Sequence, residues 1–257
     1  MPEPKLVAIQ TRYELKSFWR NPASAFFTFA FPLMFLVIFA SLNSNDHIDF
    51  LGGLKYNQYY IPAIIGYGVI SSCYANVAIA LSIRRDSGLL KRLRGTPLPV
   101  RDFIGGLLVS RTITAALLVA ISTVFGIIVY GVTFPGHYLA LIVALVVGAA
   151  TFCAIGIAVS AIVPNGDAAP AIVNFVYFPI LFISGVFFPV KSDTTLSHIA
   201  GIFPVRPLIQ AIFAAFDPRL AHGPTHGWAW SPIGVMAIWL AGASIFAVRH
   251  FSLEPRR

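Results

Sequence analysis

The sequence has few charged residues and only two cysteines. Charged residues make up 11% of the 257 residues and apolar types 57%, and the mean hydropathy is +0.79. Soluble domains carry roughly 25% charged residues, so this chain has too few to cover a folded core with a polar surface. The composition excludes an ordinary soluble domain and predicts an integral membrane protein.

The sequence also lacks the residue sets that carry enzymatic chemistry. Cys73 and Cys153 both fall within long apolar runs, which leaves neither a disulfide framework nor a CxxC metal site. There is no HExxH motif and no Ser/His/Asp set or carboxylate pair at a common depth. These absences argue against a membrane enzyme. We expect no catalytic residue, no metal and no cofactor on this chain itself.

Ionisable side chains are missing from the middle of the apolar runs. No Asp, Glu or Lys lies in the central part of any run, and Arg111 sits near an end, where its side chain can reach the interface. Proton- and sodium-coupled transporters need a buried carboxylate or broken helices at mid-membrane. The sequence therefore argues against ion-coupled transport.

Six apolar segments are long enough to cross a bilayer as helices. A hydrocarbon core of about 30 Å needs roughly 20 apolar residues, and such runs are too long for the strands of a barrel. The predicted spans are 25–42, 60–83, 104–132, 138–163, 168–190 and 230–249. The sequence thus predicts an all-α integral membrane protein with six transmembrane helices in one domain over residues 1–257.

Positive charge is distributed unevenly between the connections. With both termini in the cytoplasm, only four of the 18 lysines and arginines fall outside: Lys55, Lys191, Arg206 and Arg219. An excess of Lys and Arg marks cytoplasmic connections. We therefore predict a multi-pass protein with cytoplasmic termini, and we assign the net charge of +8 to topology rather than to nucleic-acid binding.

A basic amphipathic helix is predicted before the first span, over residues 5–20. Lys5, Arg12, Lys16 and Arg20 are spaced so that they stack in one stripe of a helix. Such a helix would lie in the headgroup layer with its cations toward anionic lipid. Whether it also touches a cytoplasmic partner is left open by the sequence.

The connection between the second and third spans, RRDSGLLKRLRGTPLPV at Arg84–Val100, predicts a short stiff knob. Ser87 can cap a short helix with Asp86 near its positive end, and Pro97 and Pro99 prevent its continuation. One face of this helix would be apolar and the other basic: Leu89, Leu90 and Leu93 against Lys91, Arg92 and Arg94. By composition alone, such a loop is equally typical of a positive-inside topology anchor.

Any substrate path through this chain must be lined mostly by apolar and aromatic groups. Asn76 and Asn174 are the preferred candidates, because an amide within the membrane favours a partner or a water-filled cavity. The other candidates are aromatic residues of the first and fifth spans: Phe31, Phe35, Phe175 and Phe178. An aromatic stripe is also typical of packing, and that alternative stays open. A lining of this kind suits hydrophobic or amphipathic substrates better than small ions.

Three motifs, in order along the chain, resemble those of bacterial ABC-2 type transporter permeases. The stretch RRDSGLLKRLRGTPLP at 84–99 is similar to the family's loop after the second span, which leads into GTL-x-R-L-x-x-T-P-L. SGVFFPV at Ser184–Val190 resembles S-G-x-x-F-P near the outer end of the fifth span. IAGIFPVRPLI at Ile199–Ile209 resembles the I-x-x-x-x-P-x-x-P-L/Y element that follows. The resemblance covers nearly the whole chain.

The resemblance implies a permease subunit of an ATP-driven exporter in the bacterial inner membrane, which moves a drug, a lipid or a lipid-linked glycan outward. It implies a second permease chain, identical or different, and a cytoplasmic ATPase subunit that binds ATP and Mg²⁺. Membrane lipid would be a further partner. The sequence has no G-x-x-x-x-G-K-[ST] motif, so any ATP must be bound by another polypeptide.

The resemblance also implies roles for two connections. A coupling helix at Asp86–Arg94 would dock on the ATPase, with its leucines in an apolar pocket and its basic residues on acidic rims. The outer segment Lys191–Gly227 would contain re-entrant helices, and the spacing of its apolar residues predicts a helix there: Leu208, Ile209, Ile212, Phe213 and Phe216.

A second class of function fits the same residues. The chain could be a stand-alone membrane facilitator, or a scaffold that binds a cytoplasmic partner through its basic loop. A separate ATPase subunit is what distinguishes the exporter from these alternatives.

Overall fold

The computed structural model describes residues 3–42, 47–49, 53–93, 95–96, 98–132, 136–191, 194–216 and 227–254. Across these ranges the chain is almost wholly helical, as predicted, with one antiparallel pair of two-residue strands. The elements are α1 (Pro4–Trp19), α2 (Pro22–Leu42), β1 (His47–Ile48), β2 (Leu54–Lys55), α3 (Tyr56–Ile70), the π-helix η2 (Ser71–Ala75), α4 (Asn76–Asp86), α5 (Leu89–Leu93), α6 (Val100–Tyr130), α7 (Tyr138–Ser160), α8 (Ala169–Ile183), α9 (Thr195–Ile202), α10 (Val205–Phe216) and α11 (Trp230–His250).

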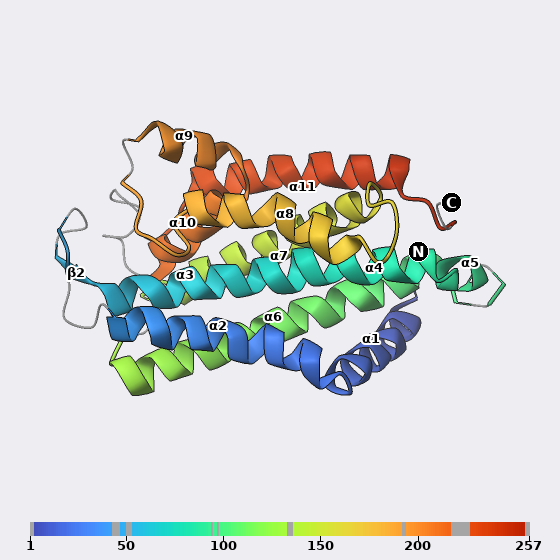
Figure 1. Ribbon diagram of the computed structural model, residues 1–257, viewed down its shortest axis with the longest axis horizontal. Coiled ribbons are helices and arrows are strands. Elements are labelled where there is room, and N and C mark those ends of the chain that lie inside the picture. Colours follow the sequence, from blue (N-terminus) through green and yellow to red (C-terminus); the bar gives the residue numbers. More distant parts are fainter. Residues whose placement is uncertain are drawn as a thin grey trace.

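Long apolar helices run side by side along the molecule (Figure 1). Four are long and apolar enough to cross a membrane: Tyr56–Asp86, Val100–Tyr130, Tyr138–Ser160 and Trp230–His250. A fifth candidate is the pair α9 and α10, which is bent by 98° at its junction. The chain is therefore a multi-pass membrane protein with four or five candidate spans, and four of the six predicted segments coincide with them.

The first predicted segment lies in α2, which has 21 residues and contains the apolar stretch Thr28–Leu42, and the fifth contains α8, which has 15 residues. The predicted fifth span extended to residue 190, but α8 ends at Ile183 because the chain turns at Gly185, whose φ is +87°. The 15 residues of α8 are fewer than the roughly 20 that a span needs, so its length alone does not make α8 a span.

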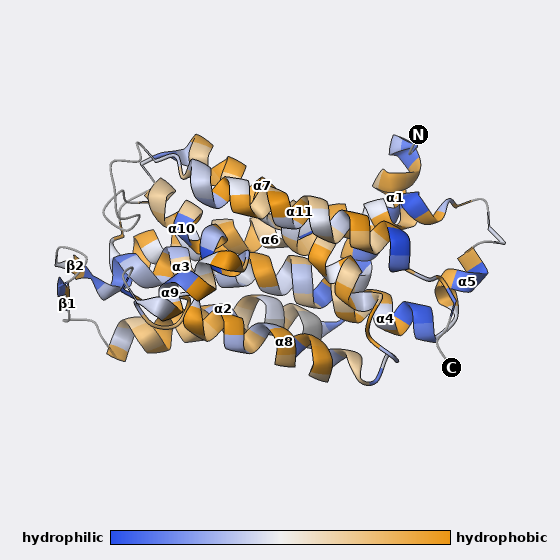
Figure 2. Cartoon of the chain, turned by 90° about the horizontal axis from the view of Figure 1, so that it is seen from above, coloured by the Kyte–Doolittle hydropathy of each residue, from blue (hydrophilic) through white to orange (hydrophobic). Residues whose placement is uncertain are grey.

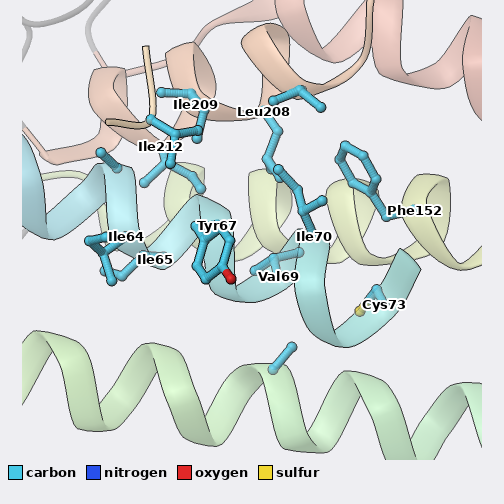
Figure 3. Close-up of a cluster of buried hydrophobic side chains, with 14 of the residues drawn as sticks. Ile64, Ile65, Tyr67, Val69, Ile70, Cys73, Phe152, Leu208, Ile209 and Ile212 are labelled. Atoms are coloured by element: carbon cyan, nitrogen blue, oxygen red, sulfur yellow. The ribbon is translucent and has the colours of Figure 1, made fainter. Parts of the chain in front are cut away.

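The segment from Tyr56 to Asp86 forms the centre of the bundle. In its most apolar 18-residue stretch, 78% is buried inside the protein, whereas the share in the corresponding stretch of α11 is 11%. Figure 3 shows α10 beside it: Ile209 and Ile212 pack at Gly66 of this segment, and Leu208 packs at Gly148 of α7. The predicted helix in the outer segment is thus present as α10, and it is buried because it packs on both α3 and α7.

The two ends of the bundle carry different elements. α5 and both chain termini lie at one end, and β2 and α9 lie at the other (Figure 1). Figure 2 shows blue, hydrophilic residues at both extremes of the molecule: at the end of α4 and on part of α5 at one extreme, and at β1 and β2 at the other. An apolar middle between polar ends is the distribution that a bilayer requires.

Candidate functional site

Of the segment Asp86–Arg94 that was predicted as one helix, Leu89–Leu93 forms the five-residue helix α5, which projects from one end of the bundle (Figure 1). Gly88 has a φ of +71°, and this left-handed conformation turns the chain between α4 and α5. The predicted cap is wrong in detail. Asp86 is the last residue of α4, and the Ser87 hydroxyl donates to the carbonyl of Arg84 at 3.1 Å. Because Gly88 separates both residues from α5, they close the preceding helix instead.

The leucine face of α5 is divided between the inside and the outside of the chain. Leu89 is 42% exposed, whereas Leu90 is 0% exposed and Leu93 is half-buried. Lys91 and Arg92 are exposed, and Arg94 lies outside the described residues. Leu90 therefore packs within this chain, and Leu89 is the leucine of α5 that faces outward.

The end of α4 is tied to the connection between α7 and α8. The guanidinium of Arg85, only 1% exposed, donates from Nη1 to the Ser160 carbonyl at 2.5 Å and from Nη2 to the Val163 carbonyl. The carboxylate of Asp86 accepts a hydrogen bond from the Gly166 amide at 3.1 Å. A cation on the last carbonyls of a helix also complements the helix dipole. Arg85 and Asp86 together hold α4, α7 and the start of α8 in one arrangement.

A second tie joins α4 to α1 and was not predicted. Arg84 forms an ion pair with Glu14, whose carboxylate is 4% exposed, and the closest N–O distance is 2.7 Å. Gln10 donates to the same carboxylate at 2.9 Å. In the sequence, Glu14 is the one acidic residue among the cations of the predicted amphipathic helix. Its isolated position was the feature from which a specific ion pair could have been predicted.

α1 packs against α6 as well as presenting a basic stripe outward. The Thr11 hydroxyl approaches the carbonyl of Gly106 at 3.4 Å, and the Arg111 guanidinium lies 5.6 Å from the Phe18 ring centroid. The cations of the predicted stripe are all exposed: Lys5, Arg12, Lys16 and Arg20. The helix was predicted over 5–20 and is observed at Pro4–Trp19.

A π-helix interrupts the central span where a polar and small-residue stretch occurs in the sequence. The hydroxyl of Ser72 in η2 donates to the Arg111 carbonyl of α6 at 3.1 Å. On the other side, a Cβ added at Gly156 of α7 would lie 2.9 Å from the Tyr74 carbonyl oxygen. The glycine therefore permits a close approach of two backbones at η2. π-helical turns recur at functional sites in membrane and soluble helices.

The aromatic path candidates fall into two groups. Phe31 and Phe35 of α2 are half-buried, with ring centroids 4.7 Å apart, and Phe35 lies 5.7 Å from Phe187. Phe175 and Phe178 of α8 are 81% and 37% exposed. The first pair belongs to an aromatic cluster within the chain, and the second pair projects away from it.

The two asparagine candidates occupy comparable environments but are not joined. Asn76 is the first residue of α4, directly after η2, and Asn174 lies on α8. Both are half-buried. No hydrogen bond connects them within the described part of the chain, although α4 and α8 pack together. Among the six path candidates, Phe31 and Phe35 are the pair with a direct ring contact in the described part of the chain.

Comparison with known proteins gives a match over most of the chain. A family model described as "ABC-2 type transporter" matches residues 5–216. The inner membrane transport permease YadH of Escherichia coli K12 is 26% identical over 160 residues, which is 60% of this chain and 60% of that protein. The protein of the same name from Shigella flexneri matches with the same identity and coverage. The chain thus aligns with 60% of the length of these relatives.

Proposed function

Because the chain belongs to the ABC-2 type transporter family, we propose that it is the permease subunit of an ABC exporter that works with a separate ATPase subunit. The observation that carries this role is α5, which exposes Leu89, Lys91 and Arg92 at the end of the bundle where both termini lie. A leucine beside two cations suits a partner with an apolar pocket rimmed by carboxylates. This sequence has no Walker-A motif, so ATP and Mg²⁺ would be bound by that partner.

The proposed permease is a single transmembrane domain of six spans in the bacterial inner membrane, with both termini cytoplasmic. α2 and α8 count as the first and fifth spans because they run alongside the four longer helices in both views (Figures 1 and 2). α1 is the interface helix and α5 the coupling helix. The 98° bend between α9 and α10 supports a re-entrant pair on the outer side.

Contacts at the end of α4 suggest how a push on α5 reaches the spans. Arg85 and Asp86 hold the α7–α8 connection, and Arg84 holds α1 through Glu14. ATP-driven closure of the ATPase subunits would displace α5. The end of α4 would then carry α1, α7 and the start of α8 with it, and the bundle would change between inward- and outward-facing arrangements.

A second permease chain, identical or different, would complete the path. α8 leaves Phe175 and Phe182 81% and 52% exposed on a surface that this chain does not cover. With the half-buried Phe31 and Phe35 of α2, these rings make an apolar lining. Such a lining suits a hydrophobic or amphipathic substrate such as a drug, a lipid or a lipid-linked glycan.

Affinity purification of the tagged full-length chain from its native membrane tests the role of α5. In mild detergent we expect a stoichiometric Walker-A ATPase to be identified by mass spectrometry. The double variant Leu89→Asp, Arg92→Glu should lose that ATPase and keep the thermal stability of the wild type. Leu196→Asp is the matched control, because Leu196 is a leucine of α9, 48% exposed, at the opposite end of the bundle.

The outcomes separate the candidate functions. If the double variant retains the ATPase, docking occurs on another surface and the role of α5 is wrong. If the folded wild-type chain brings no ATPase, the stand-alone facilitator or scaffold becomes the better assignment, and the basic loop is a topology anchor.

A further inference from the structure

α6 and α11 both pack on α7 and leave an elongated groove between them. Its middle is a cavity of about 480 Å³. Toward the α5 end it continues into a second cavity of about 420 Å³, which shares four lining residues with the first: Leu108, Ala154, Ile157 and Ser244. We call these two joined cavities the α6–α11 groove.

The length of the groove matches one leaflet of a bilayer. Its lining residues on α6 extend from Arg101 to Ile113, which is about 18 Å at the rise of a helix. Half of a hydrocarbon core of about 30 Å is about 15 Å. The groove therefore covers one leaflet's depth of apolar surface, beginning at the end of the bundle that carries α5.

The walls of the groove fit hydrocarbon. Small residues from three helices make it hollow, including Gly105, Ala150 and Ala247. Of its polar side chains, Thr112 donates its hydroxyl hydrogen to the Leu108 carbonyl at 3.0 Å, and Ser244 is half-buried. A sugar or an ion in this groove would find few partners and would remain largely desolvated. An acyl chain has no polar groups, so it needs no hydrogen-bond partners in the groove.

The mouth of the groove is basic. Arg101 lines it with a side chain that is 61% exposed, and Arg249 and His250 are exposed beside the lining residues Val248 and Phe251. The nearest carboxylate among the described residues is the fully buried Asp102, whose Oδ1 is 3.9 Å from Arg101 Nε. That separation exceeds hydrogen-bond length, so the guanidinium remains available to an anion in the headgroup layer.

We propose that the α6–α11 groove binds one anionic glycerophospholipid, with an acyl chain in the groove and its phosphate on Arg101. A helix of another protein is a poor occupant: about 18 Å of helix, about 10 Å in diameter, displaces roughly 1,400 Å³. That volume is well above either cavity. The groove opens at the α5 end of the bundle, but no residue of α5 or α8 lines it. None of its lining residues is one that we propose for ATPase docking or for the substrate path.

Native mass spectrometry of the delipidated full-length chain tests this site. Phosphatidylglycerol and phosphatidylcholine with the same acyl chains are titrated separately. We expect one saturable phosphatidylglycerol adduct, bound about tenfold more tightly than phosphatidylcholine, a preference worth about 1.4 kcal/mol. Arg101→Gln should reduce the affinity for phosphatidylglycerol to that for phosphatidylcholine. Ser244→Phe and Ala150→Phe, which fill the groove from α11 and α7, should remove both adducts.

Two controls keep the test specific. Ala241→Phe adds the same ring to an exposed position of α11 outside the groove lining, and Lys55→Gln removes an exposed charge from β2 at the opposite end of the bundle. Both should bind lipid as the wild type does. Equal binding of the two lipids to the wild type, or full binding by folded Ser244→Phe and Ala150→Phe, overturns the proposal. A change of oligomeric state in Ser244→Phe also overturns it, because the occupant would then be protein.

Discussion

Arg84 and Glu14 form a bidentate ion pair in which Nη1 and Nη2 of the guanidinium each donate to one carboxylate oxygen at 2.7 Å. Their side chains are 21% and 4% exposed, so water competes weakly for these hydrogen bonds. The Phe103 ring of α6 lies 5.3 Å from the same guanidinium. α1, α4 and α6 therefore meet at a single pair of side chains directly before the α5 knob.

Glu14→Gln should detach α1 from the end of α4. Removing the charge leaves Arg84 partly buried without its anion, and we expect a loss of roughly 2–4 kcal/mol in the free energy of unfolding. Thermal unfolding in nanodiscs measures the loss, and protease cleavage within α1 should become faster. Arg12→Gln, at an exposed position of the same helix, should change stability by no more than about 0.5 kcal/mol. Unchanged unfolding and cleavage of Glu14→Gln would show that α1 is held by its packing on α6 alone.

Arg85→Lys should weaken the link between α4 and α7. A single ammonium lacks the fork that lets Arg85 reach the Ser160 and Val163 carbonyls together. Since hydrogen bonds to charged groups contribute roughly 1.5–3 kcal/mol each, we expect a clear drop in the unfolding temperature. Arg92→Lys at an exposed position of α5 is the control. If both variants unfold at the wild-type temperature, the buried guanidinium does not stabilise the α7 end.

Gly156→Ala should disturb the packing of α7 on η2. The new Cβ would lie 2.9 Å from the Tyr74 carbonyl oxygen and 3.2 Å from that of Cys73, and both obstacles are backbone. Overpacking of this kind costs roughly 1–3 kcal/mol. A Cβ at Gly242 of α11 would meet nothing within 4 Å, so Gly242→Ala should be neutral or stabilising by up to about 1 kcal/mol. The difference in unfolding temperature between the two variants measures this cost. Equal unfolding temperatures would mean that the backbone of η2 shifts to accommodate the new Cβ.

Leu90→Ala should reduce stability, whereas Leu89→Ala should reduce docking. Leu90 is completely buried, and its truncation should cost roughly 2–5 kcal/mol. Leu89 is 42% exposed, so its truncation should leave stability within about 0.5 kcal/mol. On the proposed function, Leu89→Ala should instead reduce the amount of ATPase that co-purifies. Thermal unfolding and quantitative co-purification of both variants give the comparison. A stable Leu90→Ala variant that loses the ATPase would place Leu90 on the docking surface after all.

Hydropathy located the long helices well because lipid leaves the backbone few alternatives. The predicted spans 60–83 and 138–163 lie within a few residues of Tyr56–Asp86 and Tyr138–Ser160. Only a helix satisfies all backbone groups of a long apolar run in hydrocarbon. Apolar spacing also identified α10, because its large apolar residues recur with the period of a helix.

The detail of the candidate site was less predictable. The leucine pattern of α5 predicted an amphipathic helix, but periodicity does not say whether an apolar face meets a partner or the chain itself. The structure buries Leu90 and exposes Leu89. The close approach of η2 to α7 likewise depends on Gly156, which lies on another helix some 80 positions along the chain. Neither outcome is a local property of the sequence.

The sequence by itself determined that this chain is a helical membrane protein, and it located the segments that are apolar enough to cross the bilayer. The reason is that hydrocarbon accepts only apolar segments whose backbone hydrogen bonds are satisfied internally. Its motifs by themselves indicated the ABC-2 type transporter family. Only the tertiary structure decided how the ionisable residues at the helix ends pair. Arg84 reaches Glu14 across 70 positions, and Arg85 reaches the end of α7 across 75. Such partners are selected by helix packing in three dimensions, since a buried charge is stable only where the fold brings its counterpart within hydrogen-bond distance.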